Sequence, residues 1–401
     1  MRDTLEVVHH LQRLQSKVLS LVVWLSYFLI LVTRGRFALD RIPSDQGYGI
    51  FESARQGFRV EVFLVPYMNL ITQSIPYLIA PLPISTHAVA ASLLVHAIWA
   101  TCGLIIFLCF RLIVSSLTIA CLAGLAMILV PYMSESSLGN PGMVGFALLT
   151  TSIVISAIPS VIRSAPRTST TIGLIAGLTS PLGFLAVIPT LFRALRHRIL
   201  SGKEWTFVMA VLLSLFVNIG LIGVTGAASG RGNKVLVVWS GAGAFWWSGL
   251  LGPPAIAVGV LLFLFIRRRL NDLADTAVGL ALGSVSTATL AYYLGGIADR
   301  YFVTPAALAA LSVLVLILSM PETRHSSLIR WIAVPGVSLL LMVPAAKWFS
   351  AGWYLTSGPT WSSEVERAES ICRSASVTQV QIQISPSGTH SLRCSYLVGN
   401  E

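Results

Sequence analysis

The sequence has few charged residues. Asp, Glu, Lys and Arg make up 11% of its 401 residues, against roughly 25% in soluble domains. The mean hydropathy is +0.79, so most of the chain is expected to be solvated by lipid. The composition therefore predicts a polytopic membrane protein and argues against an ordinary soluble domain.

Two motifs with strong functional meaning are also missing. No basic helix and no stacked run of aromatic and basic residues accompanies the net charge of +11, so nucleic acid is not an expected partner. No Walker-type glycine loop is present, which argues against ATP-driven export by this chain. The positive charge is better explained by the bias of cytoplasmic loops toward Lys and Arg. The lipid bilayer is the expected partner.

The apolar runs predict an all-α polytopic membrane domain over residues 1–347. No small-x-small cleavage site follows the first run, which favours an uncleaved span over a signal peptide. Nine full spans are expected, each near the ~20 residues that a bilayer requires. They are 18–33, 87–110, 114–133, 142–160, 205–225, 250–266, 275–295, 303–319 and 330–347. With a cytoplasmic N-terminus, an odd number of spans gives an extracytoplasmic C-terminus.

Residues 168–192 are expected to form a short re-entrant hairpin instead of a span. Arg163 lies before this segment and Arg193 after it, and both flanks are basic enough to prefer the cytoplasm. Pro181 and Gly183 interrupt the apolar run. Helix breakers at membrane depth are tolerated only where protein covers the backbone. The pattern therefore predicts a helix, a break and a second helix.

The polar tail, residues 348–401, is expected to be a small extracytoplasmic α+β domain. Its even pair of cysteines, Cys372 and Cys394, suggests a disulfide. Ser363 and Glu366 form a capping-box pattern at the start of a helix, and a hairpin of two alternating strands follows. One face of the helix is expected to be solvated; it carries Glu364, Glu366 and Glu369.

Charged and aromatic residues gather in the predicted outer loops. The loop 34–86, with its short juxtamembrane helix, holds Asp45 beside the positive end of that helix dipole. A carboxylate can take a hydroxyl proton, cations can bind a departing phosphate, and aromatic or amide groups can bind a sugar. The candidate catalytic residues are Asp45, Glu52 and Glu135. The candidate substrate-binding residues are Asn140, Arg231, Lys234, Trp246, Trp247, Arg300 and Tyr301.

Several short motifs are spread over nearly the whole chain in a specific order. They are Ser44-Asp45-Gln46, Pro66-Tyr67, Leu138-Gly139-Asn140, Ser180-Pro181-Leu182, Arg300-Tyr301-Phe302 and Gly358-Pro359-Thr360-Trp361. In this order the sequence resembles bacterial, chiefly actinobacterial, multi-span proteins related to the C-type (GT-C) glycosyltransferase superfamily. The resemblance implies a GT-C-like membrane domain in the bacterial plasma membrane.

The resemblance also implies a reaction. The sugar donor would be a polyprenyl-phosphate sugar, and the acceptor a glycan, lipid or protein of the cell envelope. Asp45 takes the position of the acidic residue that acts as base or metal ligand. No cofactor is certain, and a divalent metal ion, Mg²⁺ or Mn²⁺, stays open. Members of that superfamily tend to carry an acidic pair or Asp-Gly at this position, whereas this chain has Ser44 and Gln46 around Asp45. The alternative that this protein is a catalytically inactive member therefore stays open.

The same residues have simpler structural interpretations. Asp45 can cap the helix that follows it, and Asn140 before Pro141 is itself a turn signal. His87 and His96 do not make a metal site without further ligands. The alternative function is a non-enzymatic transporter or assembly partner for cell-envelope glycolipids or polysaccharide.

Overall fold

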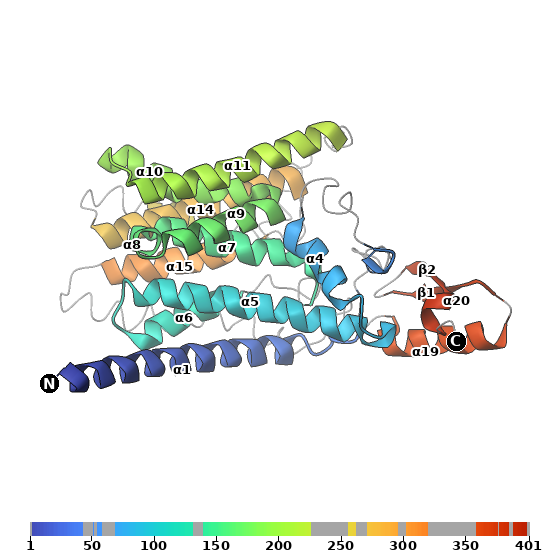
Figure 1. Cartoon of the computed structure of the whole chain (residues 1–401). Helices are drawn as coiled ribbons and strands as arrows, with labels where there is room; N and C mark the ends of the chain where they lie inside the picture. The colour runs from blue at the N-terminus through green and yellow to red at the C-terminus, as the bar shows by residue number, and fades with distance from the viewer. Residues whose placement is uncertain are drawn as a thin grey trace.

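The fold is a bundle of helices with a small α+β tail at one end (Figure 1). The computed structural model describes residues 2–42, 51, 54–57, 69–130, 139–225, 256–261, 271–295, 302–319, 358–375, 377–384 and 388–398. The start of the first helix and the tail lie at opposite ends of the bundle. We call these ends the N-terminal end and the tail end.

Four helical segments of the described chain are long and apolar enough to cross a membrane, which suggests membrane insertion. They lie in α1 (Arg2–Arg34), in the 3₁₀ turn η1 (Ile84–Thr86) with α5 (His87–Arg111), in α11 (Gly202–Thr225) and in α14 (Asp272–Gly295). Shorter helices fill the bundle between them. These are α4 (Leu70–Ile79), α6 (Leu117–Ile128), η2 (Pro141–Met143) with α7 (Val144–Ala157), and α15 (Val303–Ser319).

The described residues do not confirm the expected nine spans. The predicted span 114–133 is α6, which has 12 residues. The Ser116 hydroxyl accepts the N–H of Ile119 where this helix begins. The Arg34 guanidinium donates to the carbonyls of Ile128 and Val130 where it ends. Both ends are therefore capped within the bundle, which fixes a helix shorter than the apolar run. Of the predicted spans 250–266 and 330–347, the structure describes only 256–261.

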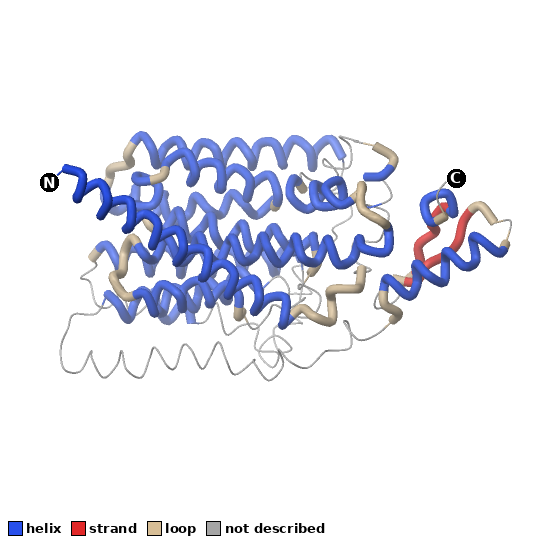
Figure 2. The backbone as a smooth tube through the Cα atoms, turned by 60° about the horizontal axis from the view of Figure 1, so that its bottom comes forward, coloured by secondary structure: helices blue, strands red, loops and turns tan. Residues whose placement is uncertain are grey.

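Helix α5 is one of the long helices that lie side by side in the bundle (Figure 2). Its side chains Trp99, Phe107 and Phe110 are fully buried, and the helix contacts α1, α6 and α7. The Tyr27 hydroxyl of α1 donates to the Cys121 carbonyl of α6 at 2.9 Å. A helix that is apolar on every side is expected to be enclosed in this way.

A helical hairpin occupies the segment where a re-entrant hairpin is expected. After α8 (Pro159–Ser164), helix α9 (Pro166–Thr179) enters the bundle, the 3₁₀ segment η3 (Pro181–Val187) turns, and α10 (Ile188–His197) returns. The Gly177 carbonyl at the break accepts the Asn218 amide of α11 at 2.8 Å. A Cβ on Gly183 would overlap the Gly177 backbone. The break therefore needs glycine and is enclosed by protein.

The tail consists of α19 (Trp361–Ser374), the antiparallel strands β1 (Gln379–Gln383) and β2 (Thr389–Arg393), and α20 (Cys394–Leu397). Val380 pairs with Leu392 in the hairpin, and both side chains are buried with Ile382 in its small core. Helix α19 begins earlier than the capping-box pattern indicates. Its N-cap is Thr360, whose side chain accepts from Ser363 N–H. Tyr396 lies in α20, beyond the second strand.

Candidate functional site

Most of the predicted site residues lie outside the described part of the chain. These are Asp45, Glu52, Glu135, Arg231, Lys234, Trp246, Trp247, Arg300 and Tyr301. Their roles stay predictions. The site can therefore be built only from the residues that flank them and from Asn140.

Asn140 is fully buried and forms a turn. Its Oδ1 accepts the N–H of Gly142 at 2.9 Å, and it is the N-cap of η2. This geometry supports the turn interpretation, because an Asn side chain commonly bonds the backbone two residues ahead. Its predicted contact with a sugar stays a prediction.

The C-terminal tail docks on the segment that follows α1. The backbone N–H of Trp361 donates to the Asp40 carbonyl at 2.8 Å, and the Asp40 carboxylate accepts both the N–H and the hydroxyl of Ser362. Arg41 donates to the Gly358 carbonyl at 2.8 Å. The Trp361 indole donates to the Ile84 carbonyl. A carboxylate at the start of α19 complements the helix dipole, so Asp40 acts as a cap supplied from the other end of the chain.

Segments that flank the predicted catalytic loops come together at this docking surface. A Cβ on Gly139 would lie 3.2 Å from the Ala38 Cβ and would overlap the Ser92 hydroxyl. Gly139 also has a φ of +72°, which favours glycine. The guanidinium of Arg55 lies 5.7 Å from the ring centroid of Tyr396 in the tail. Arg55 therefore adjoins the tail, and Gly139 adjoins Ala38, two residues before the Asp40 that binds the tail.

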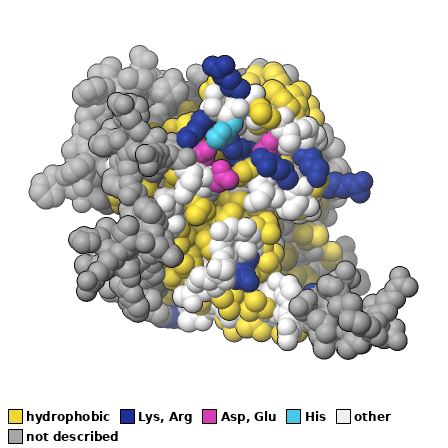
Figure 3. Space-filling model, turned by 90° about the vertical axis from the view of Figure 1, so that its left-hand side faces the viewer, with side chains coloured by type: hydrophobic (Ala, Val, Ile, Leu, Met, Phe, Trp, Pro, Cys, Tyr) yellow, Lys and Arg dark blue, Asp and Glu magenta, His cyan; other side chains and the backbone are white. Residues whose placement is uncertain are grey.

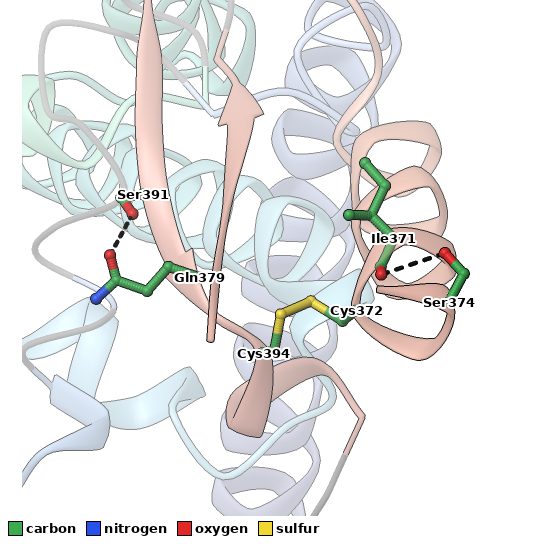
Figure 4. The surroundings of a disulfide bond; sticks show 6 residues. All are labelled: Ile371, Cys372, Ser374, Gln379, Ser391 and Cys394. Carbon is green, nitrogen blue, oxygen red and sulfur yellow. Dashed lines mark hydrogen bonds between the residues drawn. A yellow bond between two sulfur atoms is a disulfide. The ribbon is translucent and has the colours of Figure 1, made fainter. Parts of the chain in front are cut away.

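The tail is tied together internally by a disulfide and a buried carboxylate. Cys372 of α19 and Cys394 of α20 form the disulfide, with Cα atoms 5.4 Å apart (Figure 4). Cross-linking residues at a sequence separation of 22 stabilises a small domain by about 3 kcal/mol. Glu364 accepts from Arg367 and, at 2.8 Å, from the Gln383 N–H of β1. Its side chain is only 8% exposed, so the expectation of a solvated face is wrong for Glu364.

The two buried histidines near the tail end are packing residues in this structure. His87 lies against the Leu82 carbonyl with its Nε2 at 3.0 Å, and the Nδ1 of His96 lies 3.5 Å from the Ser92 hydroxyl. A Cβ on Gly35 would overlap the His96 ring, so glycine allows the close approach. Among the described residues, no group of three or more His, Cys, Asp or Glu is arranged to hold a metal ion.

A second polar cluster, absent from the predicted site, lies at the N-terminal end. The Glu204 side chain is 2% exposed and pairs with Arg193 at 2.7 Å and with Arg163 at 3.5 Å. Its second oxygen accepts the N–H and the hydroxyl of Ser201, both at 2.8 Å. Glu204 thus joins the two basic flanks of the α9–α10 hairpin to the start of α11.

Asp275 makes the corresponding connection to α14. It pairs with Arg196 and with His197, the latter at 2.6 Å. A pocket of about 540 Å³ lies among these groups, between the hairpin, α11 and α14. In Figure 3 acidic and basic side chains gather in the upper part of this end, with apolar surface below them. Because the acidic and basic groups are paired, the arrangement is suited to holding the hairpin in place.

A sequence signal for this cluster existed. Ser201 and Glu204 have the S-x-x-E spacing of a capping box, and the Ser201 hydroxyl does accept the Glu204 N–H. The remaining contacts could not be predicted from this local pattern, because Arg163 and Asp275 lie on other helices.

Comparison with protein-family models and with curated proteins finds no match for this chain.

Proposed function

We propose that this protein is a membrane glycosyltransferase that works at the tail end of the bundle. It transfers a sugar from a polyprenyl-phosphate donor to a cell-envelope acceptor outside the membrane. The observation that carries the proposal is the docking of the start of α19 on Asp40, five residues before Asp45. Gly139, which follows the Glu135 segment, adjoins the same surface.

The proposed reaction is a direct displacement at the anomeric carbon. Asp45 takes the proton of the acceptor hydroxyl, the new bond forms from that oxygen, and the bond between the sugar and the phosphate breaks. The phosphate leaves with the electron pair. Arg300, with Arg231 or Lys234, would bind it, since Arg can hold a phosphate through two hydrogen bonds. A metal ion, Mg²⁺ or Mn²⁺, is an alternative source of the positive charge that would bind the phosphate.

The experiment is a transfer assay with the purified protein in liposomes and a short-chain polyprenyl-phosphate sugar. Asp45→Asn keeps the shape of the side chain and removes its basicity. We expect transfer to fall by ~10²–10⁴-fold, with donor affinity and thermal stability unchanged. An active Asn variant would remove Asp45 from the mechanism and leave Glu52 or Glu135 as the base.

The alternative is a non-enzymatic transporter or assembly partner for envelope glycolipids. The broken helix between α9 and α10 favours it, because transporters use discontinuous helices inside the membrane. The same liposomes separate the two functions. Movement of a labelled glycolipid across the bilayer without any transferred product would favour the alternative, whereas a transferred product favours the enzyme.

A further inference from the structure

A groove opens at the N-terminal end between the first turns of two helices. Helix α9 begins at Pro166 and α11 at Gly202, and these two helices contact each other. The groove has a volume of about 810 Å³. Its polar lining comes from Arg167, Thr170, Thr171, Ser201, Lys203 and Thr206. It is a different space from the pocket beside Glu204 and Asp275, although Ser201 borders both.

The groove has a positive charge that the described chain does not neutralise. None of the residues that line it is a carboxylate. Arg167 makes no hydrogen bond or ion pair with the described residues. The Lys203 ammonium donates to the Arg163 carbonyl at 2.7 Å, which holds it at the groove and leaves two of its N–H groups for a ligand. The first turns of both helices add partial positive charge. This differs from the neighbouring pocket, where cations and carboxylates are paired.

A buried hydroxyl in the wall of the groove has no hydrogen-bond partner among the described residues. The Thr170 Oγ1 is shielded from solvent and makes no hydrogen bond within the described chain. Buried polar groups nearly always have one. Thr179 in the same helix bonds the carbonyl four residues earlier, and Thr206 across the groove does the same. Thr170 lines the groove, and a Thr side chain in a helix has two χ1 rotamers available, so a rotation about χ1 would turn this hydroxyl toward an oxygen-rich ligand there.

An apolar surface continues from the groove along α11. Met209, Leu213 and Phe216 are 59%, 57% and 68% exposed. They follow Thr206 at helical spacing, so all four share one face of the helix. Trp205, next to Thr206 in the chain, is half exposed, and Trp is enriched where a membrane meets water. A ligand here would have a polar head in the groove and an apolar part along α11.

We propose that this groove binds the phosphate of an anionic lipid headgroup. Arg167 and Lys203 bind the phosphate oxygens, the Thr170 hydroxyl donates a further hydrogen bond, and the acyl chains lie against Met209, Leu213 and Phe216. Basic pockets between membrane helices are known to bind such headgroups. The proposal is independent of the reaction proposed for the tail end.

The test uses the full-length protein in nanodiscs of phosphatidylcholine containing phosphatidylglycerol. The protein is released into detergent, and retained phosphatidylglycerol is measured by native mass spectrometry. We expect the Arg167→Gln/Lys203→Gln variant to lose retention by roughly tenfold or more, since each charged hydrogen bond contributes about one factor of ten. The control, Lys17→Gln/Arg111→Gln, removes the same charge at the same end but outside the groove. It should retain the lipid.

A second pair of variants separates a specific binding site from non-specific electrostatic attraction. Thr170→Val keeps size and charge and removes the hydroxyl, and we expect a severalfold loss of retained lipid. Thr168→Val, an exposed position of the same helix, should have no effect. Equal losses in both charge variants, or full retention by Thr170→Val, would contradict the proposal. Calorimetry with inorganic phosphate tests the source of the phosphate; tight binding of phosphate without lipid retention would contradict a lipid ligand.

Discussion

The carboxylate of Asp40 accepts the backbone N–H and the hydroxyl of Ser362, which lies 322 positions later in the chain. This contact joins the end of the first helix to the start of the C-terminal tail. Asp40 lies in the predicted outer loop 34–86, five residues before Asp45. The docked tail therefore holds the first part of that loop.

Asp40→Ala should release the start of α19. The carboxylate caps the helix from outside, and losing such a cap costs about 1–2 kcal/mol. Hydrogen exchange of residues 361–363 should become faster, and the thermal midpoint should fall. Glu366→Gln, an exposed carboxylate of the same helix, is the matched control. Unchanged exchange in Asp40→Ala would show that the tail is held by its other contacts.

The stability of the tail should depend on pH through Glu364. The hydrogen bond from Arg367, together with the bond from the Gln383 N–H, lowers the pKa of Glu364 below its ordinary value of 4.5. The ionised carboxylate therefore stabilises the folded tail above that pH. The contribution is lost as the pH falls through the lowered pKa. Protease resistance of the tail should decrease over this acidic range, and Glu364→Gln should weaken the dependence. If Glu364→Gln showed the same dependence of protease resistance on pH as the unaltered chain, Glu364 would not be the group responsible.

The helix break should not tolerate a side chain at Gly183. Gly183→Ala places a Cβ against the Gly177 backbone, and such overpacking costs about 1–3 kcal/mol. Gly220→Ala in α11 is the control, because no described atom outside the helix's own backbone lies within 4 Å of the added Cβ. Thermal unfolding in detergent should show a clear loss for the first variant and none for the second. Equal midpoints would mean that the hairpin can adjust.

Glu204→Gln should destabilise the N-terminal end by about 3 kcal/mol. It leaves Arg193, whose side chain is 10% exposed, without a charged partner, and an uncompensated buried charge is costly. Arg163→Gln should cost under about 1 kcal/mol, because that partner is 57% exposed. Replacing Arg193 by Met in the Glu204→Gln background should restore part of the lost stability. The coupling would be contradicted if the double variant lost as much stability as the losses of Glu204→Gln and Arg193→Met added together.

Features encoded in short stretches of sequence could be predicted. The helix break was marked by Pro181 and Gly183 inside an apolar run, between two basic flanks. The tail helix, its hairpin and the pairing of Cys372 with Cys394 followed from local periodicity and from an even number of polar-tail cysteines. These features need no knowledge of distant contacts.

Features that depend on distant partners could not be predicted. Helix α19 begins at Trp361 because Asp40 and Thr360 cap it, whereas the local pattern pointed to Ser363. Glu364 is buried because a strand that follows it in the chain supplies the Gln383 N–H. Arg34 is buried because it binds the last carbonyls of α6. In the sequence, Asp40, Glu364 and Arg34 all look like ordinary surface charges.

The proposed transfer reaction requires the two ends of the bundle to face opposite sides of the membrane, with the tail end outside. The most direct test is labelling of intact cells with a membrane-impermeant thiol reagent. Single-cysteine reporters would be Ser370→Cys in the tail and Thr168→Cys at the N-terminal end, in a chain whose free Cys102, Cys109 and Cys121 are replaced by Ala. We predict labelling of Ser370→Cys in intact cells and of Thr168→Cys only after permeabilisation. Labelling of Thr168→Cys in intact cells, with Ser370→Cys protected, would contradict the account.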